Sequence, residues 1–229
     1  MTDKGLIKYL SEFATTERIK RFNDVLVNRT RYITVVLEEL YQEHNASAVL
    51  RTCDCFGIQD VHVLEGKNSF NVNDSIAMGA SKWLSISKYK LHEIELSNTI
   101  TKLKEKKYRI IATVPDSQAV PLDKFDLQKG KIALLFGTEL NGLSNECKSL
   151  ADEFLYIPMS GFTESFNVSV SAGIILHLLT QKLHTSNLDW RLPEEEKDEL
   201  ILNWLRESVK SSEQLEKDYA LKRGQTFSS

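Results

Sequence analysis

Residues 153–181 read EFLYIPMSGFTESFNVSVSAGIILHLLTQ, and this stretch decides how the rest of the chain is interpreted. An apolar, β-branched run ends at Pro158, a polar turn containing Gly161 and Ser165 follows, and an apolar segment with helical character closes the stretch. The pattern predicts a buried strand, a tight loop and a buried helix in immediate succession. In an open α/β sheet, ligands bind beyond the carboxyl end of a strand, so we expect a site at this loop.

The start of the expected helix carries two polar side chains, Asn167 and Ser169. Such side chains accept hydrogen bonds from the free N–H groups of a first helical turn. This pattern leaves two interpretations open, since the residues can be helix caps alone or can also belong to a binding site.

Strands and helices alternate along the rest of the chain. The expected strands 32–38, 109–114 and 131–136 are short, mainly apolar runs, which is typical of strands buried on both faces of a parallel sheet. The expected strands are residues 32–38, 60–65, 83–89, 109–114 and 131–136. The expected helices are residues 5–27, 44–57 and 92–107, with a short helix around Ile76. The alternation predicts a mainly parallel α/β sheet flanked by helices.

Composition limits the class of protein. The chain has 229 residues, of which 41% are hydrophobic and 27% are charged, enough for one folded domain with extensions. The longest apolar run, 168–179, is too short to cross a bilayer, and the N-terminus does not resemble a signal peptide. We therefore expect no membrane association.

The three cysteines point to a reduced, cytoplasmic protein rather than to a disulfide framework. Cys53 and Cys55 are two residues apart on an expected helix, so they point in different directions, and no second Cys/His pair follows at zinc-ligand spacing. We expect no metal.

The net charge of −3 argues against a nucleic-acid-binding surface that is basic over the whole protein, but it is compatible with a local basic patch. The most basic part of the chain lies in its first thirty or so residues, at Arg18, Lys20, Arg21, Arg29 and Arg31. Such a cluster is either a solvated helix face or a nucleic-acid contact.

The segment 137–144, GTELNGLS, follows the expected strand 131–136 and resembles a phosphate-binding loop. Gly137 and Gly142 have the spacing of that loop, but Leu143 stands where a lysine would meet the phosphates. No G-x-G-x-x-G follows any strand either. The pattern thus indicates a glycine-hinged loop with one acid, Glu139, next to the loop at 160–167.

Three segments taken together resemble the ordered motifs of the SpoU group of SPOUT RNA ribose methyltransferases. They are NASAVLRT at 45–52, LFGTELNGL at 135–143, and IPM at 157–159 followed by SFNVSV at 165–170. The resemblance extends over residues 32–180. Within the group, the chain is most similar to the TrmH family, the tRNA guanosine-18 2′-O-methyltransferases.

This resemblance implies a parallel sheet with a deep trefoil knot in its carboxyl-terminal part, a homodimer, and S-adenosylmethionine as the cofactor. The cofactor contacts that it implies fall at Thr113, Gly137, Ile157 and Phe166. Phe166 departs from the leucine common at that position, and because the contact is mainly through the backbone we expect little loss. The implied domains are an N-terminal basic helical extension at 1–31, the methyltransferase domain at 32–181, and a C-terminal helical extension at 182–229.

The reaction that the resemblance implies is methylation of the ribose 2′-OH of guanosine 18 in the D-loop of tRNA. Arg51 would be the reactive centre, and Asn45, Glu139, Ser165 and Asn167 would orient Arg51 and the ribose. Because a guanidinium is protonated in nearly any protein site, we expect Arg51 to hold a phosphate and stabilise alkoxide charge, or to lose its proton only in the assembled complex. The alternatives are 2′-O-methylation of ribosomal RNA and a catalytically silent RNA-binding SPOUT protein.

Overall fold

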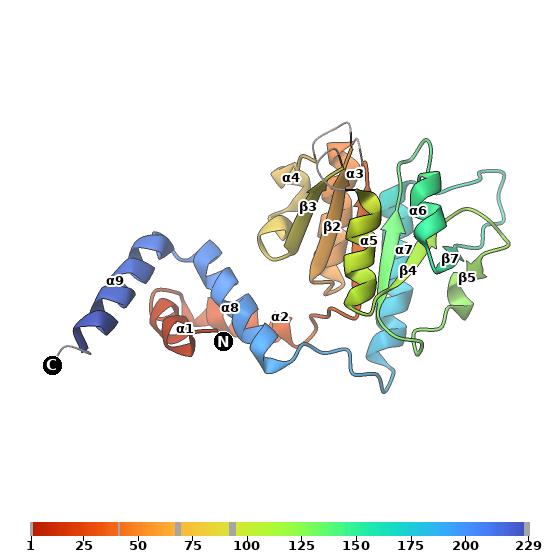
Figure 1. Cartoon of the computed structure of the whole chain (residues 1–229). Coiled ribbons are helices and arrows are strands. Elements are labelled where there is room, and N and C mark those ends of the chain that lie inside the picture. The colour runs from red at the N-terminus through yellow and green to blue at the C-terminus, as the bar shows by residue number, and fades with distance from the viewer. Residues whose placement is uncertain (1, 41, 67–69, 92–94, 227–229) are drawn as a thin grey trace. The chain divides into compact units, whose positions relative to one another are not determined.

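The protein is described here from a computed structural model that covers residues 2–40, 42–66, 70–91 and 95–226 (Figure 1). Its chain forms two compact units. One is continuous, Thr30–Trp190, and the other combines the two ends of the chain, Met1–Arg29 and Arg191–Ser229. The two terminal segments, considered above as separate extensions, therefore pack with one another.

The unit Thr30–Trp190 is built on a seven-stranded sheet with the strand order β3-β2-β1-β6-β4-β7-β5, in which every pair of neighbours is parallel. This confirms the mainly parallel sheet. The strands are β1 (Ile33–Glu38), β2 (Asp60–Glu65), β3 (Ser85–Lys90), β4 (Arg109–Thr113), β5 (Val120–Pro121), β6 (Ile132–Phe136) and β7 (Glu153–Tyr156).

The central strands β1 and β6 are buried along their whole length, as their almost uniformly apolar sequences predict. Their register pairs Val35 with Leu134, and both side chains enter the same hydrophobic core. The next residue, Val36, points to the opposite face and joins a second core. The sheet thus separates two hydrophobic layers.

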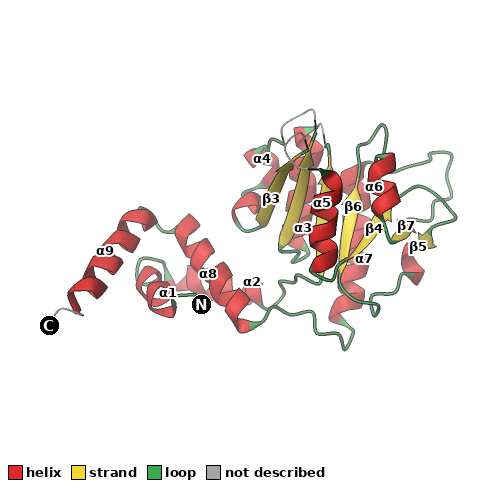
Figure 2. Ribbon diagram, viewed as in Figure 1, coloured by secondary structure: helices red, strands yellow, loops and turns green. Residues whose placement is uncertain are grey.

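Helices cover both faces of the sheet (Figure 2). One core receives side chains from α3 (Glu43–Cys55) and α7 (Val168–His184), two helices that also contact each other. The opposite core receives side chains from α5 (Leu96–Glu105) and α6 (Asn145–Leu150). Three short helices lie in connections: α4 (Asp74–Ala77), η1 (Ala80–Lys82) and η2 (Leu122–Lys124). The start of the predicted helix 92–107 lies partly outside the described residues.

The second unit contains α1 (Lys4–Ser11), α2 (Thr16–Leu26), α8 (Glu194–Ser208) and α9 (Ser212–Thr226). The prediction of one helix over 5–27 is wrong, because Thr15 begins a new helix: its side chain accepts a hydrogen bond from the N–H of Arg18 at 3.2 Å. Trp204 on α8 is buried against Phe22 on α2, with ring centroids 5.4 Å apart.

Candidate active site

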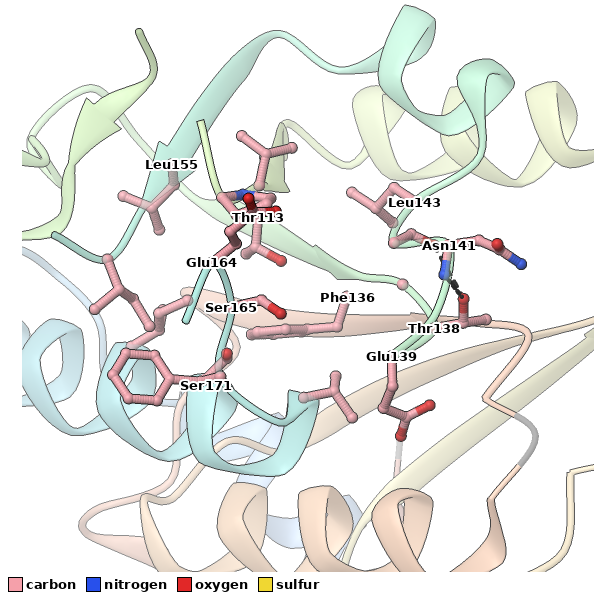
Figure 3. A pocket seen from close by; sticks show the side chains of 18 of the residues that line it. Thr113, Phe136, Thr138, Glu139, Asn141, Leu143, Leu155, Glu164, Ser165 and Ser171 are labelled. Atoms are coloured by element: carbon pink, nitrogen blue, oxygen red, sulfur yellow. Dashed lines mark hydrogen bonds between the residues drawn. The ribbon is translucent and has the colours of Figure 1, made fainter. Parts of the chain in front are cut away.

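A pocket of about 350 Å³ lies at the carboxyl edge of the sheet (Figure 3). It is lined by the ends of β4, β6 and β7, by the loop after β6, and by the loop before α7 together with the first turns of that helix. Because all of these strands are parallel, their carboxyl ends meet at one edge. Segments far apart in the sequence thereby form one concave surface of the size that holds small ligands.

The loop after β6 closes on itself. Thr138 and Gly142 exchange two backbone hydrogen bonds, at 3.1 and 2.9 Å, and Gly142 has a positive φ of 65°. A Cβ atom on Gly137 would lie 2.2 Å from the carbonyl carbon of Gly142, closer than packed atoms allow. Glycine at 137 therefore lets two stretches of backbone come into contact at the pocket wall. This contact accounts for the glycines at 137 and 142, so a phosphate-binding role is not needed to explain them.

The far end of this loop is held by an acid that the sequence analysis missed. Glu38, the last residue of β1, is only 6% exposed and accepts a hydrogen bond from the N–H of Ser144 at 2.8 Å. The Ser144 side chain in turn caps α6 by accepting from the N–H of Cys147. The signal in the sequence that could have pointed to Glu38 is a charged residue at the end of an otherwise apolar strand.

The Cys147 thiol lies close to the same carboxylate. Burial, and then the neighbouring Glu38 carboxylate, raise the pKa of the Cys147 thiol.

Asn45 on α3 joins the three motif segments. Its side-chain N–H donates to Glu139 in the loop after β6, and its side-chain oxygen accepts from Asn167 at 3.1 Å. Asn45 is only 3% exposed, so its own amide group has little access to water. In Figure 3 the Glu139 side chain points from the loop toward α3.

Asn167 also caps α7. Its side-chain oxygen accepts hydrogen bonds from the N–H and the hydroxyl of Ser169, at 2.9 and 2.6 Å. The two interpretations of this helix start are therefore compatible, because one amide group can cap the helix with its oxygen and reach Asn45 with its nitrogen.

The structure brings most of the predicted site residues together. The predicted cofactor residues all line the pocket: Thr113, Gly137, Ile157 and Phe166. Glu139 and Ser165 line it too, whereas Asn45 and Asn167 adjoin it through Glu139. The Thr113 hydroxyl donates to the backbone oxygen of Leu135 at 2.7 Å. Arg51 is not part of the lining, and it lies exposed on α3, off the buried stripe of that helix.

The basic residues near the N-terminus have different surroundings. Arg18, Lys20 and Arg21 are exposed on α2. Arg29 is 1% exposed, with its guanidinium 5.5 Å from the ring centre of Trp204, so it is not placed to contact a phosphate. Arg31 forms an ion pair with Asp60 at 3.1 Å. The prediction of RNA contact is thus wrong for Arg29 in this arrangement, because tertiary packing buries the side chain.

Within the part of the chain that the structure describes, no group of three or more His, Cys, Asp and Glu side chains is placed to hold a metal ion. A search of the same residues finds no helix with the length and apolar character to cross a membrane.

Comparison with known proteins agrees with this architecture. The model of the SpoU rRNA Methylase family matches residues 32–177. The tRNA (guanosine(18)-2′-O)-methyltransferase of Borreliella burgdorferi is 40% identical over 210 residues, covering 92% of this chain and 94% of that protein.

Two solved structures share the fold. The TrmH/SpoU tRNA modifying enzyme of A. aeolicus superposes with a TM-score of 0.75 at 31% identity, covering 85% of this chain and 98% of its own. The SpoU methyltransferase AviRb of Streptomyces viridochromogenes, solved in complex with AdoMet, has a TM-score of 0.55 at 20% identity, covering 72% and 62%. With the family match spanning most of the sheet and all three motif segments, the chain belongs to the SpoU methylase family.

Proposed function

We propose that this protein is a tRNA (guanosine(18)-2′-O)-methyltransferase, which transfers a methyl group from S-adenosylmethionine to the ribose 2′-OH of guanosine 18 in the D-loop of tRNA. The observation that carries the proposal is the network in which Asn45 links Glu139 and Asn167 beside the pocket. The Borreliella burgdorferi enzyme named for this reaction, similar over nearly the whole chain, supports the choice of substrate.

The pocket suits the proposed cofactor. Its volume of about 350 Å³ lies in the range of small-molecule sites, and the loop wall at Gly137 exposes backbone that a side chain would cover. Thr113, Gly137, Ile157 and Phe166 are the residues that would hold the cofactor. When bound, S-adenosylmethionine supplies an electrophilic methyl group on a sulfonium ion.

Arg51 is the proposed reactive centre. A guanidinium is a poor base because it keeps its proton in nearly any protein site. Its contribution is instead to hold the phosphate next to the ribose and to stabilise the negative charge that develops on the 2′-oxygen. Deprotonation of Arg51 only in the assembled complex is the other way in which it can act. Asn45, Glu139, Ser165 and Asn167 orient the ribose.

The tRNA-binding face includes Arg18, Lys20 and Arg21, which are exposed on α2. Exposed cations on a helix neutralise phosphates and give salt-dependent binding without reading sequence. Arg31 is held by Asp60 and contributes less.

The protein acts as a homodimer in this proposal. The first turn of α7 carries the exposed Val170, and the loop before this helix carries the exposed Phe162 and Phe166. Exposed apolar side chains gathered next to a pocket favour a protein interface. A second copy of the chain is the partner that we infer.

The knot is a further part of the proposal. The connection 114–131 lies against the carboxyl-terminal segment: β5 within it pairs with β7, and Lys182 on α7 donates to the carbonyl of Asp123 at 2.6 Å. In a knotted chain, the segment that contains β7 and α7 would pass through this connection, and the β5–β7 pairing and the Lys182–Asp123 hydrogen bond would hold it there. We also place the protein in the cytoplasm, in agreement with three cysteines that form no disulfide.

The experiment is ribose-methylation mapping of total RNA from a deletion strain, with the purified protein added back with S-adenosylmethionine. We expect the mark at guanosine 18 of tRNA to be absent from the strain and restored in vitro, and a transcript with a 2′-deoxy residue at position 18 to be inert. Loss of a mark in ribosomal RNA instead would favour the first alternative, to which the name of the family model points. No change in any RNA would favour a silent RNA-binding protein.

A further inference from the structure

Three charged side chains line the pocket: Glu139, Lys148 and Glu164. Glu139 is engaged by Asn45. Lys148 is half-buried on α6, and Glu164 is exposed in the loop before α7, from which it points into the pocket in Figure 3. The side chains of Lys148 and Glu164 form no ion pair with any residue that the structure describes. The pocket thus offers one cation and one carboxylate to a ligand.

Another part of the lining is apolar. Leu155, Ile157, Val168 and Ile175 come from β7, the residue after it, and α7, and they suit a flat, weakly polar group such as an adenine ring. A ligand with an aromatic base at one end and a zwitterion at the other matches both parts of the lining.

We propose that Lys148 binds the α-carboxylate of the cofactor and that Glu164 binds its α-ammonium group, so that these two side chains make the site specific for an intact amino-acid end. This inference rests on the proposed function. S-adenosylmethionine carries a carboxylate, an ammonium and a sulfonium, hence a net charge of +1. The three charged side chains of the lining sum to −1, which complements it.

The different exposure of Lys148 and Glu164 predicts which of the two contacts contributes more to the affinity for the cofactor. Lys148 is half-buried, so a charge-assisted hydrogen bond from its ammonium group to a carboxylate is screened less by water. Glu164 is exposed, and an exposed ion pair contributes little. Lys148 should therefore matter more than Glu164.

The test is calorimetric binding of three compounds to the full-length protein, with no turnover required. S-adenosylmethionine has both groups, its decarboxylated form keeps only the ammonium, and 5′-methylthioadenosine has neither. The variants are Lys148→Met and Glu164→Gln. Lys102→Met is the matched control, because it removes the same charge from an exposed position on α5, outside the pocket.

Lys148→Met should weaken binding of S-adenosylmethionine by about tenfold and leave the decarboxylated form unchanged. Glu164→Gln should weaken both compounds by about threefold, since both keep the ammonium. Binding of 5′-methylthioadenosine should be the same in all proteins, and Lys102→Met should match the wild type.

Equal weakening of S-adenosylmethionine and its decarboxylated form by Lys148→Met, or no weakening of either, would overturn the inference while leaving the proposed function intact. A wild-type protein that binds none of the three compounds would overturn both.

Discussion

At the scale of single residues, Asn45 shows how one side chain can connect distant motifs. Its amide nitrogen donates to Glu139 while its amide oxygen accepts from Asn167, and an ionised carboxylate could not do both because it has no donor. Because Asn45 is buried, the loss of either hydrogen bond would leave a buried polar group without a partner and would lower the free energy of unfolding. The network therefore fixes the loop after β6 against the start of α7.

Arg51→Ala is expected to lower kcat by at least about tenfold, equivalent to a barrier increase of about 1.4 kcal/mol, while cofactor binding and thermal unfolding stay unchanged. Arg51 is exposed and off the packed face of α3, so its loss leaves the core intact. Arg51→Lys should restore little, since an ammonium lacks the planar fork. Single-turnover methyl transfer measures this, and activity above about a tenth of wild type in either variant contradicts the role.

Gly137→Ala is expected to abolish cofactor binding and to lower the free energy of unfolding by about 1–3 kcal/mol, because its methyl group would overlap the backbone of Gly142. Gly224→Ala on α9 is the control, since a Cβ there meets nothing within 4 Å. Calorimetry and urea unfolding report the two effects. Normal binding by Gly137→Ala would mean that the loop does not form the cofactor wall.

At the scale of elements, β2 and β3 bury a histidine. His62 on β2 is 6% exposed, and its Nδ1 lies 3.0 Å from the hydroxyl of Tyr89 on β3. Burial lowers the pKa of His62; the Asp60 carboxylate opposes this shift, and Lys106 adds to it. The folded state therefore favours the neutral imidazole.

The resulting pH dependence has a definite sign. Below about pH 6.5, the unfolded chain takes up a proton at this site before the folded chain does, so stability is complete above that pH and falls as the pH decreases. His62→Gln should flatten the decline in unfolding free energy between about pH 6.5 and 5, by at most about 1.4 kcal/mol per pH unit. The exposed His44→Gln is the control, and identical slopes for wild type and His62→Gln would contradict the expectation.

The helix α2 supplies the next prediction. Arg18→Gln combined with Arg21→Gln should weaken tRNA binding and reduce the slope of log K against log salt by about two units, one for each lost phosphate contact. Cofactor affinity should not change. Glu194→Gln with Glu195→Gln on α8 is the matched control for altered charge in the same unit. A full salt slope in the arginine variant would place the RNA elsewhere.

At the scale of the whole molecule, the division into two compact units separates the proposed tasks. The unit Thr30–Trp190 contains the pocket and the motif network, and the unit made of the two chain ends contains the exposed cations of α2. Phosphate contacts position a nucleic acid and carry no sequence information. We therefore assign the positioning of tRNA to the unit with α2, and methyl transfer to the unit with the pocket.

The dimer prediction belongs to this scale. Val170→Glu on α7 should convert a dimer to a monomer in sedimentation and lower the affinity for the cofactor, because an exposed apolar position next to the pocket would carry a charge. Leu221→Glu makes the same kind of change at an exposed position of α9 and should leave the dimer intact. An active wild-type monomer would contradict the proposal.

The parallel sheet, its buried strands and the three motif segments can be predicted from the sequence, because they depend on local apolar patterns and on short stretches of characteristic residues. The resemblance to a known family singled out Thr113, Gly137, Ile157 and Phe166, and these four residues line one pocket.

Which polar groups meet depends on the packing of the folded chain. Arg29 and Arg18 look alike in sequence, yet one is buried against Trp204 and the other is exposed. Glu38 and Lys148 gained their positions at the loop and the pocket from strand order and helix packing. Contacts between residues far apart in the chain depend on how the layers pack, and local sequence patterns carry no information about that packing.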